Sequence, residues 1–169
     1  PSSCYLRFNN SSLIQSGKSM SPLASRASGR AVKSHSVHTH TQLAALCHRK
    51  GENGPEVLLV TSSNGRWILP KGWPIDGMKP SEAAMVEAWE EAGVKKGKVD
   101  RKSMGCFMGT KITSSGDEEP CLTKVYAVKV LKTEANYPEA DRRERLWVSP
   151  AEAAEMVTED GLRSILRAL

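Results

Sequence analysis

The sequence lacks the features that mark several specialised classes of protein. No apolar run in its 169 residues approaches the roughly 20 residues that a membrane-spanning helix needs, so we expect no membrane partner. The 4 cysteines form neither a C-x-x-C pair nor a tight cluster. That spacing argues against a structural zinc site and a disulfide scaffold, and it favours a reducing compartment. The predicted location is therefore cytoplasmic.

Several phosphate-binding and catalytic motifs are also missing. The chain contains no G-x-x-x-x-G-K-[ST] loop, no G-x-G-x-x-G fingerprint and no serine nucleophile elbow. These absences argue against a P-loop nucleotidase, a dinucleotide-binding Rossmann domain and a serine hydrolase.

Acidic residues are absent from residues 1–40, and this absence explains the net charge of +5. The segment contains five basic residues, which are Arg7, Lys18, Arg26, Arg30 and Lys33. The rest of the chain has 24 − 5 = 19 basic and 19 acidic residues. We therefore predict a basic, Ser-rich N-terminal extension over 1–40 and a charge-balanced domain over 41–169, with no nucleic acid polymer as its partner.

The extension itself has several interpretations. Its composition fits a mitochondrial transit peptide. The plainer interpretations are an expression remnant or an upstream misread start, with Met20 as an initiator. A nucleic-acid binder that depends on this extension is a further alternative, and salt-sensitive binding lost on its deletion would support it.

The pattern of apolar residues predicts a mixed α/β domain. Strands are expected over residues 42–48, 57–61, 66–69, 103–112, 122–130 and 145–148. Helices are expected over residues 81–92, 150–157 and 161–168. Ser81 is the expected cap of the first helix and Gly93 its stop, while Ser149 and Glu152 form a capping box. This order of elements indicates a sheet with helices packed on it.

The first predicted helix gathers acidic residues on one face. Glu87, Glu90 and Glu91 are spaced i, i+3 and i+4, so their carboxylates repel one another. A bound divalent cation such as Mg²⁺ would offset that repulsion, because it takes carboxylate oxygens together with substrate phosphates. A solvated acidic face is the alternative. On the opposite side we expect burial of Met85, Ala88, Trp89 and Ala92.

The loop before this helix is suited to the same site. Residues 70–80 contain three prolines and two glycines, which favours a structured loop over a helix. Within it, Gly72 stands beside Lys71, so the loop can bring backbone and one cation close to a metal ion.

The stretch 72–94 resembles the Nudix box. The pattern is a Gly, five residues, a Glu, seven residues, Arg-Glu, an aliphatic, any residue, Glu-Glu, any residue, a Gly and an aliphatic. The matching positions are Gly72, Glu87, Glu90, Glu91, Gly93 and Val94. Ala88 is a small stand-in for the larger aliphatic, and Met78 and Val86 replace the first Glu and the Arg. The resemblance covers roughly residues 41–169.

The resemblance implies a fold and an activity. The fold is an α/β/α sandwich around a mixed β-sheet. The activity is hydrolysis of a nucleoside diphosphate linked to another moiety, with Mg²⁺ or Mn²⁺ as cofactor. Carried over to this chain, Glu87, Glu90 and Glu91 are the catalytic and metal-binding carboxylates, and the backbone of Gly72 is a further metal ligand. One of these glutamates is the first candidate for the base; Glu118 or Glu119, in the predicted loop after residue 112, is the second.

The motif from Arg66 to Gly72 (RWILPKG) resembles the subgroup that acts on diadenosine polyphosphates and diphosphoinositol polyphosphates. Arg66 and Lys71 would then contact the polyphosphate. Trp73 either stacks on an adenine or packs within the protein. Arg145, together with Arg142 and Arg143, either adds phosphate contacts or joins a surface ion-pair network. The partner is therefore a small nucleotide or polyphosphate, and a homodimer is left open.

The two departures from the box leave a second function open. In the family the Arg is thought to orient a catalytic Glu, and Val86 cannot do so. We expect slower turnover, and we expect an apolar contact between Met78 and Val86 in place of an ion pair. The alternative function is a weak or inactive nucleotide-binding or regulatory domain on the same fold.

Overall fold

The computed structural model describes residues 40–113 and 116–169. The predicted extension therefore lies outside the described residues, apart from its last residue, His40. The strands are β1 (His40–Lys50), β2 (Pro55–Thr61), β3 (Trp67–Ile68), β4 (Lys71–Gly72), β5 (Val94–Val99), β6 (Gly105–Ile112), β7 (Glu118–Thr133) and β8 (Arg145–Val148). The helices are α1 (Pro80–Ala92), α2 (Pro150–Met156) and α3 (Asp160–Arg167).

All of these strands belong to one mixed sheet. Its main order is β3-β2-β1-β7-β5, with β4 joined to β1, β6 to β7 and β8 to β2. The pairing of β1 with β7 is parallel, and the other pairings are antiparallel. The predicted mixed sheet is confirmed.

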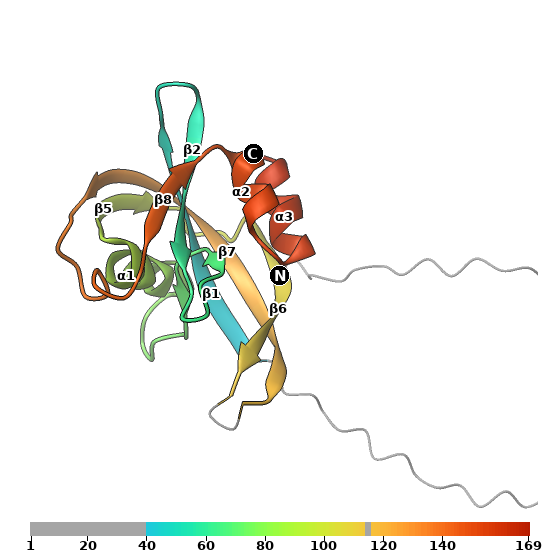
Figure 1. Ribbon diagram of the computed structural model, residues 1–169. Helices are drawn as coiled ribbons and strands as arrows, with labels where there is room; N and C mark the ends of the chain where they lie inside the picture. Colours follow the sequence, from blue (N-terminus) through green and yellow to red (C-terminus); the bar gives the residue numbers. More distant parts are fainter. Residues whose placement is uncertain (1–39, 114–115) are drawn as a thin grey trace, which may run out of the picture. The chain divides into compact units, whose positions relative to one another are not determined.

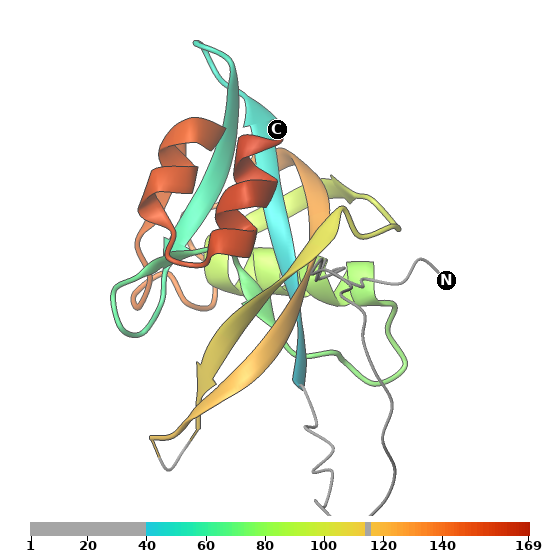
Figure 2. The ribbon, with the colours of Figure 1, turned by 90° about the vertical axis from the view of Figure 1, so that its right-hand side faces the viewer.

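Helices cover both faces of the sheet, as Figures 1 and 2 show for α1 on one side and for α2 and α3 on the other. Side chains along β1 alternate between the two layers because successive residues of a strand point to opposite faces. Leu43 and Cys47 belong to the buried cluster under α1, whereas Ala44 and Leu46 belong to the cluster under α2 and α3. The predicted α/β/α sandwich is therefore confirmed.

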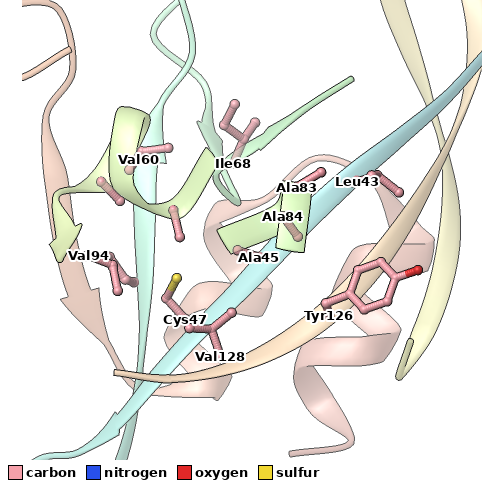
Figure 3. Packing of buried hydrophobic residues seen from close by; sticks show 13 residues of the cluster. Leu43, Ala45, Cys47, Val60, Ile68, Ala83, Ala84, Val94, Tyr126 and Val128 are labelled. Atoms are coloured by element: carbon pink, nitrogen blue, oxygen red, sulfur yellow. The ribbon is translucent and has the colours of Figure 1, made fainter. Parts of the chain in front are cut away.

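Helix α1 approaches the sheet through small side chains, several of which Figure 3 shows against β1. The alanines at 83, 84, 88 and 92 are at most 1% exposed. The prediction was right for Ala88 and Ala92, and Met85 packs at the edge of the cluster. It was wrong for Trp89, which is only half-buried; the Nζ atom of Lys95 lies 4.4 Å from its ring centroid.

The ends of α1 differ in how well the sequence predicted them. The helix begins at Pro80 with Lys79 as its N-cap, so the expected capping by Ser81 was wrong. The helix begins one residue earlier than expected because Pro80 fits the first helical position, where no N–H is needed. Ser81 therefore lies inside the first turn, and it is buried. The predicted end is confirmed: Gly93 caps α1 in the left-handed conformation, with φ of 68°.

Three strand assignments also differ from prediction. β5 (VKKGKV) was missed because its lysines and glycine suppress the apolar signal; it lies at the end of the sheet order, where charged side chains protect an edge. β4 was expected to be loop, and it pairs with β1 over two residues. Glu118 and Glu119, also expected in a loop, are the first residues of β7.

Among the described residues, no helix has both the length and the apolar character needed to cross a bilayer.

Candidate metal site

The candidate site forms where β4 meets the second half of α1. Strand β1 holds β4 in place: Leu43 pairs with Gly72 and Ala44 with Lys71, and the N–H of Ala45 donates to the carbonyl of Pro70 at 2.9 Å. The same strand packs against the alanine face of α1. Strand β1 therefore positions both β4 and α1.

Glu91 is the most enclosed carboxylate of the site, with only 6% of its surface exposed. Its Oε2 atom accepts the backbone N–H of Lys71 at 3.0 Å, and its Oε1 atom accepts a hydrogen bond from Nη2 of Arg143. Burial raises the pKa of the Glu91 carboxyl, while the Lys71 N–H and the positive charge of Arg143 oppose the rise. Both oxygens are thus fixed by neighbouring groups.

Glu87 lies directly against the backbone of Gly72. A Cβ atom at position 72 would come within 2.0 Å of Oε1 and 2.3 Å of Cδ of Glu87, so the carboxylate fills the space that any other residue would need. Burial, followed by the negative charges of Glu91 and Glu90, raises the pKa of the Glu87 carboxyl from 4.5 to about 7. The absence of a side chain at Gly72 is what permits this contact.

Glu90 differs from the other two carboxylates in its exposure to solvent. Its side chain is exposed, and its carbonyl accepts the N–H of Glu139 at 3.1 Å. Within residues 40–113 and 116–169, no three His, Cys, Asp or Glu side chains are arranged to hold a metal ion. The structure brings Glu87 and Glu91 against β4, and the exposed Glu90 lies close enough for its charge to act on Glu87.

Arg143 is a largely enclosed cation of this cluster, and the sequence named it only together with Arg142 and Arg145. It lies in the segment between β7 and β8, and its side chain is 15% exposed. The guanidinium contacts the carboxylates of Glu91 and Glu139, and Nη1 donates to the carbonyl of Thr61 at 2.7 Å. Of the two interpretations for this arginine, the structure shows the ion-pair network.

Trp73 lies beside a residue that the sequence did not indicate. Nζ of Lys111, on β6, is 5.0 Å from the ring centroid of Trp73, and Trp73 is 39% exposed. A cation and an accessible aromatic ring therefore lie together directly after β4.

Arg66 and Arg145, the other predicted substrate contacts, have protein partners. Arg66 has a half-exposed side chain whose Nη1 lies 4.0 Å from Oε1 of Glu159. Nη1 of Arg145 donates to the carbonyls of Ala92 and Glu134, both at 2.9 Å. Arg145 thus binds the end of α1 to the segment that follows β7.

The remaining predicted positions lie at the margins of the site. Glu119, one of the alternative bases, has its Oε2 atom 3.5 Å from Nε2 of His40. Met78 is 37% exposed and Val86 is half-buried. Neither of these two belongs to a described core cluster, and the expected contact between them stays a prediction.

Comparison with known proteins identifies relatives of this architecture. A family model described as "NUDIX domain" matches residues 40–169. The plant protein "Nudix hydrolase 13, mitochondrial" from Arabidopsis thaliana is 35% identical over 121 residues, covering 68% of this chain and 59% of that protein. The mouse "Diphosphoinositol polyphosphate phosphohydrolase 3-alpha" is 52% identical over 64 residues, covering 34% of this chain and 35% of that protein.

In both cases the chain spans less than two thirds of the relative's length. Among solved structures, an Ap4A hydrolase from C. elegans aligns with a TM-score of 0.57 at 19% identity, covering 76% of this chain and 94% of the other. At that identity the likeness establishes the fold.

Proposed function

Because the chain belongs to the Nudix family, we propose that it catalyses metal-dependent hydrolysis of a pyrophosphate bond, either in a nucleoside diphosphate derivative or in a diphosphoinositol polyphosphate. The observation that supports this most directly is the contact of Glu87 with the backbone of Gly72 beside the buried Glu91. The contact joins the first glycine of the box to its catalytic helix.

The residues present fit a hard divalent cation. Carboxylate and backbone oxygens are the ligands that Mg²⁺ takes, and Mn²⁺ accepts them too. Burial, followed by the negative charges of Glu91 and Glu90, raises the pKa of Glu87, and a bound cation would offset the repulsion. We assign Glu87, Glu90, Glu91 and the backbone of Gly72 as the residues that hold the ion. When bound, it would neutralise phosphate charge and make water more acidic.

Of the box glutamates, we assign Glu87 as the general base, because its carboxylate lies against the backbone of Gly72 and beside the buried Glu91. A positioned carboxylate within reach of the attacking water can take its proton. In the proposed step a water oxygen attacks phosphorus, the bond from phosphorus to the bridging oxygen breaks, and the water proton passes to a carboxylate oxygen of Glu87. Glu91, held by Lys71 and Arg143, keeps its orientation during this step.

The substrate that we propose is a diadenosine polyphosphate or a diphosphoinositol polyphosphate. Such molecules carry several anionic groups, and fixed cations are needed to bind them. Lys71, next to Gly72, and Lys111, beside Trp73, are candidates for two of these charges, and Arg66 is a third. The exposed ring of Trp73 offers a surface on which a base can stack. The similarity to the mouse diphosphoinositol polyphosphate phosphohydrolase supports the diphosphoinositol alternative.

A hydrolysis screen tests the proposal. The panel is diadenosine polyphosphates, diphosphoinositol polyphosphates, ADP-ribose, nucleoside triphosphates and RNA 5′ ends, each with Mg²⁺, with Mn²⁺ and with EDTA. Glu90→Gln and Glu91→Gln should each abolish nearly all turnover. Glu52→Gln, at an exposed turn, is the matched control and should retain full activity. Metal-dependent activity that survives both box substitutions would refute the assignment.

The same screen distinguishes the proposed hydrolase activity from the alternative function. Val86 in place of the box Arg is the observation that favours a weak or inactive nucleotide-binding domain. That alternative predicts binding by calorimetry without turnover on every member of the panel. The cytoplasmic location and the homodimer stay predictions, and one relative is named mitochondrial.

A further inference from the structure

Arg143 is placed to fix the geometry of the carboxylate cluster. Its guanidinium bonds to three different groups: the carboxylates of Glu91 and Glu139 and the carbonyl of Thr61. Thr61 is the last residue of β2, so this bond anchors the guanidinium to the sheet. The side chain is only 15% exposed, which limits its freedom to move.

The cluster needs such a cation, because its own helix contains none. The sequence of α1, PSEAAMVEAWEEA, has no Lys or Arg. The guanidinium of Arg143 stands between two carboxylates, those of Glu91 and Glu139, and contacts both. The position that is Arg in the box is Val86 here, so the positive charge must come from another part of the chain.

The shape of the guanidinium matters as much as its charge. Nε bonds to Glu139, Nη1 to Thr61 and Nη2 to Glu91, so one planar group orients three acceptors at once. An ammonium group supplies a point charge without this fixed fork. The other carboxylate oxygen of Glu91, Oε2, accepts the backbone N–H of Lys71.

We propose that Arg143 is a positioning residue, which orients Glu91 for the metal ion and supplies from the β7–β8 segment the cation that α1 lacks. This inference rests on the proposed function. Arg143 acts through Glu91 and does not touch the reacting atoms. Hydrogen-bonded partners of ligating carboxylates typically change metal affinity or activity by about 10- to 100-fold when they are removed.

The test compares Arg143→Ala and Arg143→Lys with the wild-type chain. Mn²⁺ affinity is measured by calorimetry, at a temperature where circular dichroism shows each protein folded, and kcat and KM are measured on the best substrate of the screen. Arg167→Ala is the matched control, since it breaks an arginine–carboxylate pair between Arg167 on α3 and Glu155 on α2 (2.7 Å). It should leave affinity and kcat unchanged.

We expect Arg143→Ala to weaken Mn²⁺ binding by about 10- to 100-fold and to lower kcat similarly, with KM changed by less than about twofold. The Mn²⁺ affinity and kcat of Arg143→Lys should lie between those of the alanine variant and the wild type, because lysine keeps the positive charge but lacks the planar guanidinium donors. Wild-type Mn²⁺ affinity and kcat in either variant would overturn the inference. If the alanine variant does not fold, the lysine variant decides. A wild-type chain that neither binds Mn²⁺ nor turns over would instead count against the proposed function.

Discussion

Position 72 shows how strongly a single residue limits this site. The backbone of Gly72 and the carboxylate of Glu87 occupy adjoining space, and a methyl group there would overlap the carboxylate. The overlap involves the end of a flexible side chain, so the protein can relieve it by moving Glu87. The consequence should therefore appear in activity more than in stability.

We predict that Gly72→Ala lowers metal-dependent kcat by at least about tenfold, in line with the effect of disturbing a metal ligand's surroundings. Thermal unfolding should shift by only a few degrees. Gly109→Ala is the control, because the nearest atom to its added methyl would be 3.7 Å away, an ordinary contact. Equal activity of the two variants would show that the Glu87 contact is not needed.

Glu87 should also give the metal-free protein a distinctive dependence on pH. Its folded-state pKa is about 7, against an ordinary value of 4.5. Between these values the folded chain keeps a proton that the unfolded chain has released. The free energy of unfolding contributed by this group therefore falls as the pH rises through that window, and the loss is complete above pH 7.

The measurement is urea unfolding in EDTA at pH values from 5 to 8, for the wild type and for Glu87→Gln. The free energy of unfolding of the variant should fall less steeply with rising pH than that of the wild type, since its amide does not titrate. The remaining slope belongs to other groups such as Glu91, whose pKa is also raised. Identical slopes in the two proteins would contradict the pKa assigned to Glu87.

At this scale the sequence predicted the carboxylates and Gly72 but not their partners. Spacing along one helix is a local property, so Glu87, Glu90 and Glu91 could be placed on one face in advance. The partner of Glu91, Arg143, is 52 positions away. Lys111 approaches Trp73 from a different strand. Such contacts depend on the topology of the sheet, which no local pattern contains.

Among the elements, α1 depends on groups outside itself at its C-terminal end. The carbonyl of Ala92 accepts a hydrogen bond from Arg145, which also binds the carbonyl of Glu134. The guanidinium carbon of Arg145 lies 5.0 Å from the ring centroid of Tyr137, so it connects β8 to both the helix and the preceding segment. This arrangement indicates a structural role for a residue that the sequence associated with substrate.

We predict that Arg145→Met lowers the free energy of unfolding by about 1–3 kcal/mol, because it leaves carbonyl groups without their donor. The KM for the polyphosphate substrate should stay within about twofold of the wild type. Urea unfolding and steady-state kinetics on the same preparation measure both quantities. A large rise in KM with unchanged stability would favour the phosphate contact instead.

The elements with strong local signals were the ones that the sequence predicted well. The Ser149 capping box is present, with the N–H of Glu152 donating to the Ser149 hydroxyl at 3.3 Å, and β8 has the predicted bounds. β4 could not be foreseen because two residues are too short for any periodicity. β5 is stabilised by pairing with β7, which local composition does not reveal.

For the whole molecule, the parallel pairing of β1 with β7 is the contact that joins distant parts of the chain. It aligns His40–His48 with Cys121–Lys129, across the intervening strands and α1. The proposed metal-binding residues lie on β4 and α1, which are both held by β1. Binding of an ion should therefore stabilise the folded state as a whole.

We predict that Mg²⁺ or Mn²⁺ raises the melting temperature by several degrees. A ligand at about 100 times its Kd stabilises the folded state by about 2.7 kcal/mol. EDTA should reverse the shift, NaCl at matched ionic strength should not reproduce it, and Glu91→Gln should reduce it. Scanning calorimetry gives all four values, and a shift of the same size in the Gln variant would argue against binding at this site.

The alanine face of α1 sets the distance between this helix and the sheet, and so the position of the site's carboxylates. Because Ala84, Ala88 and Ala92 are fully buried and interiors are close-packed, their small volume sets how near the helix comes to the sheet. A larger side chain there would lift the helix, and with it Glu87 and Glu91, away from β4. Substitution of these alanines by larger residues should therefore be limited by the distance over which Glu87 and Glu91 can still contact β4. In proteins that evolve from this sequence, a larger core beneath α1 would require compensating changes in the site.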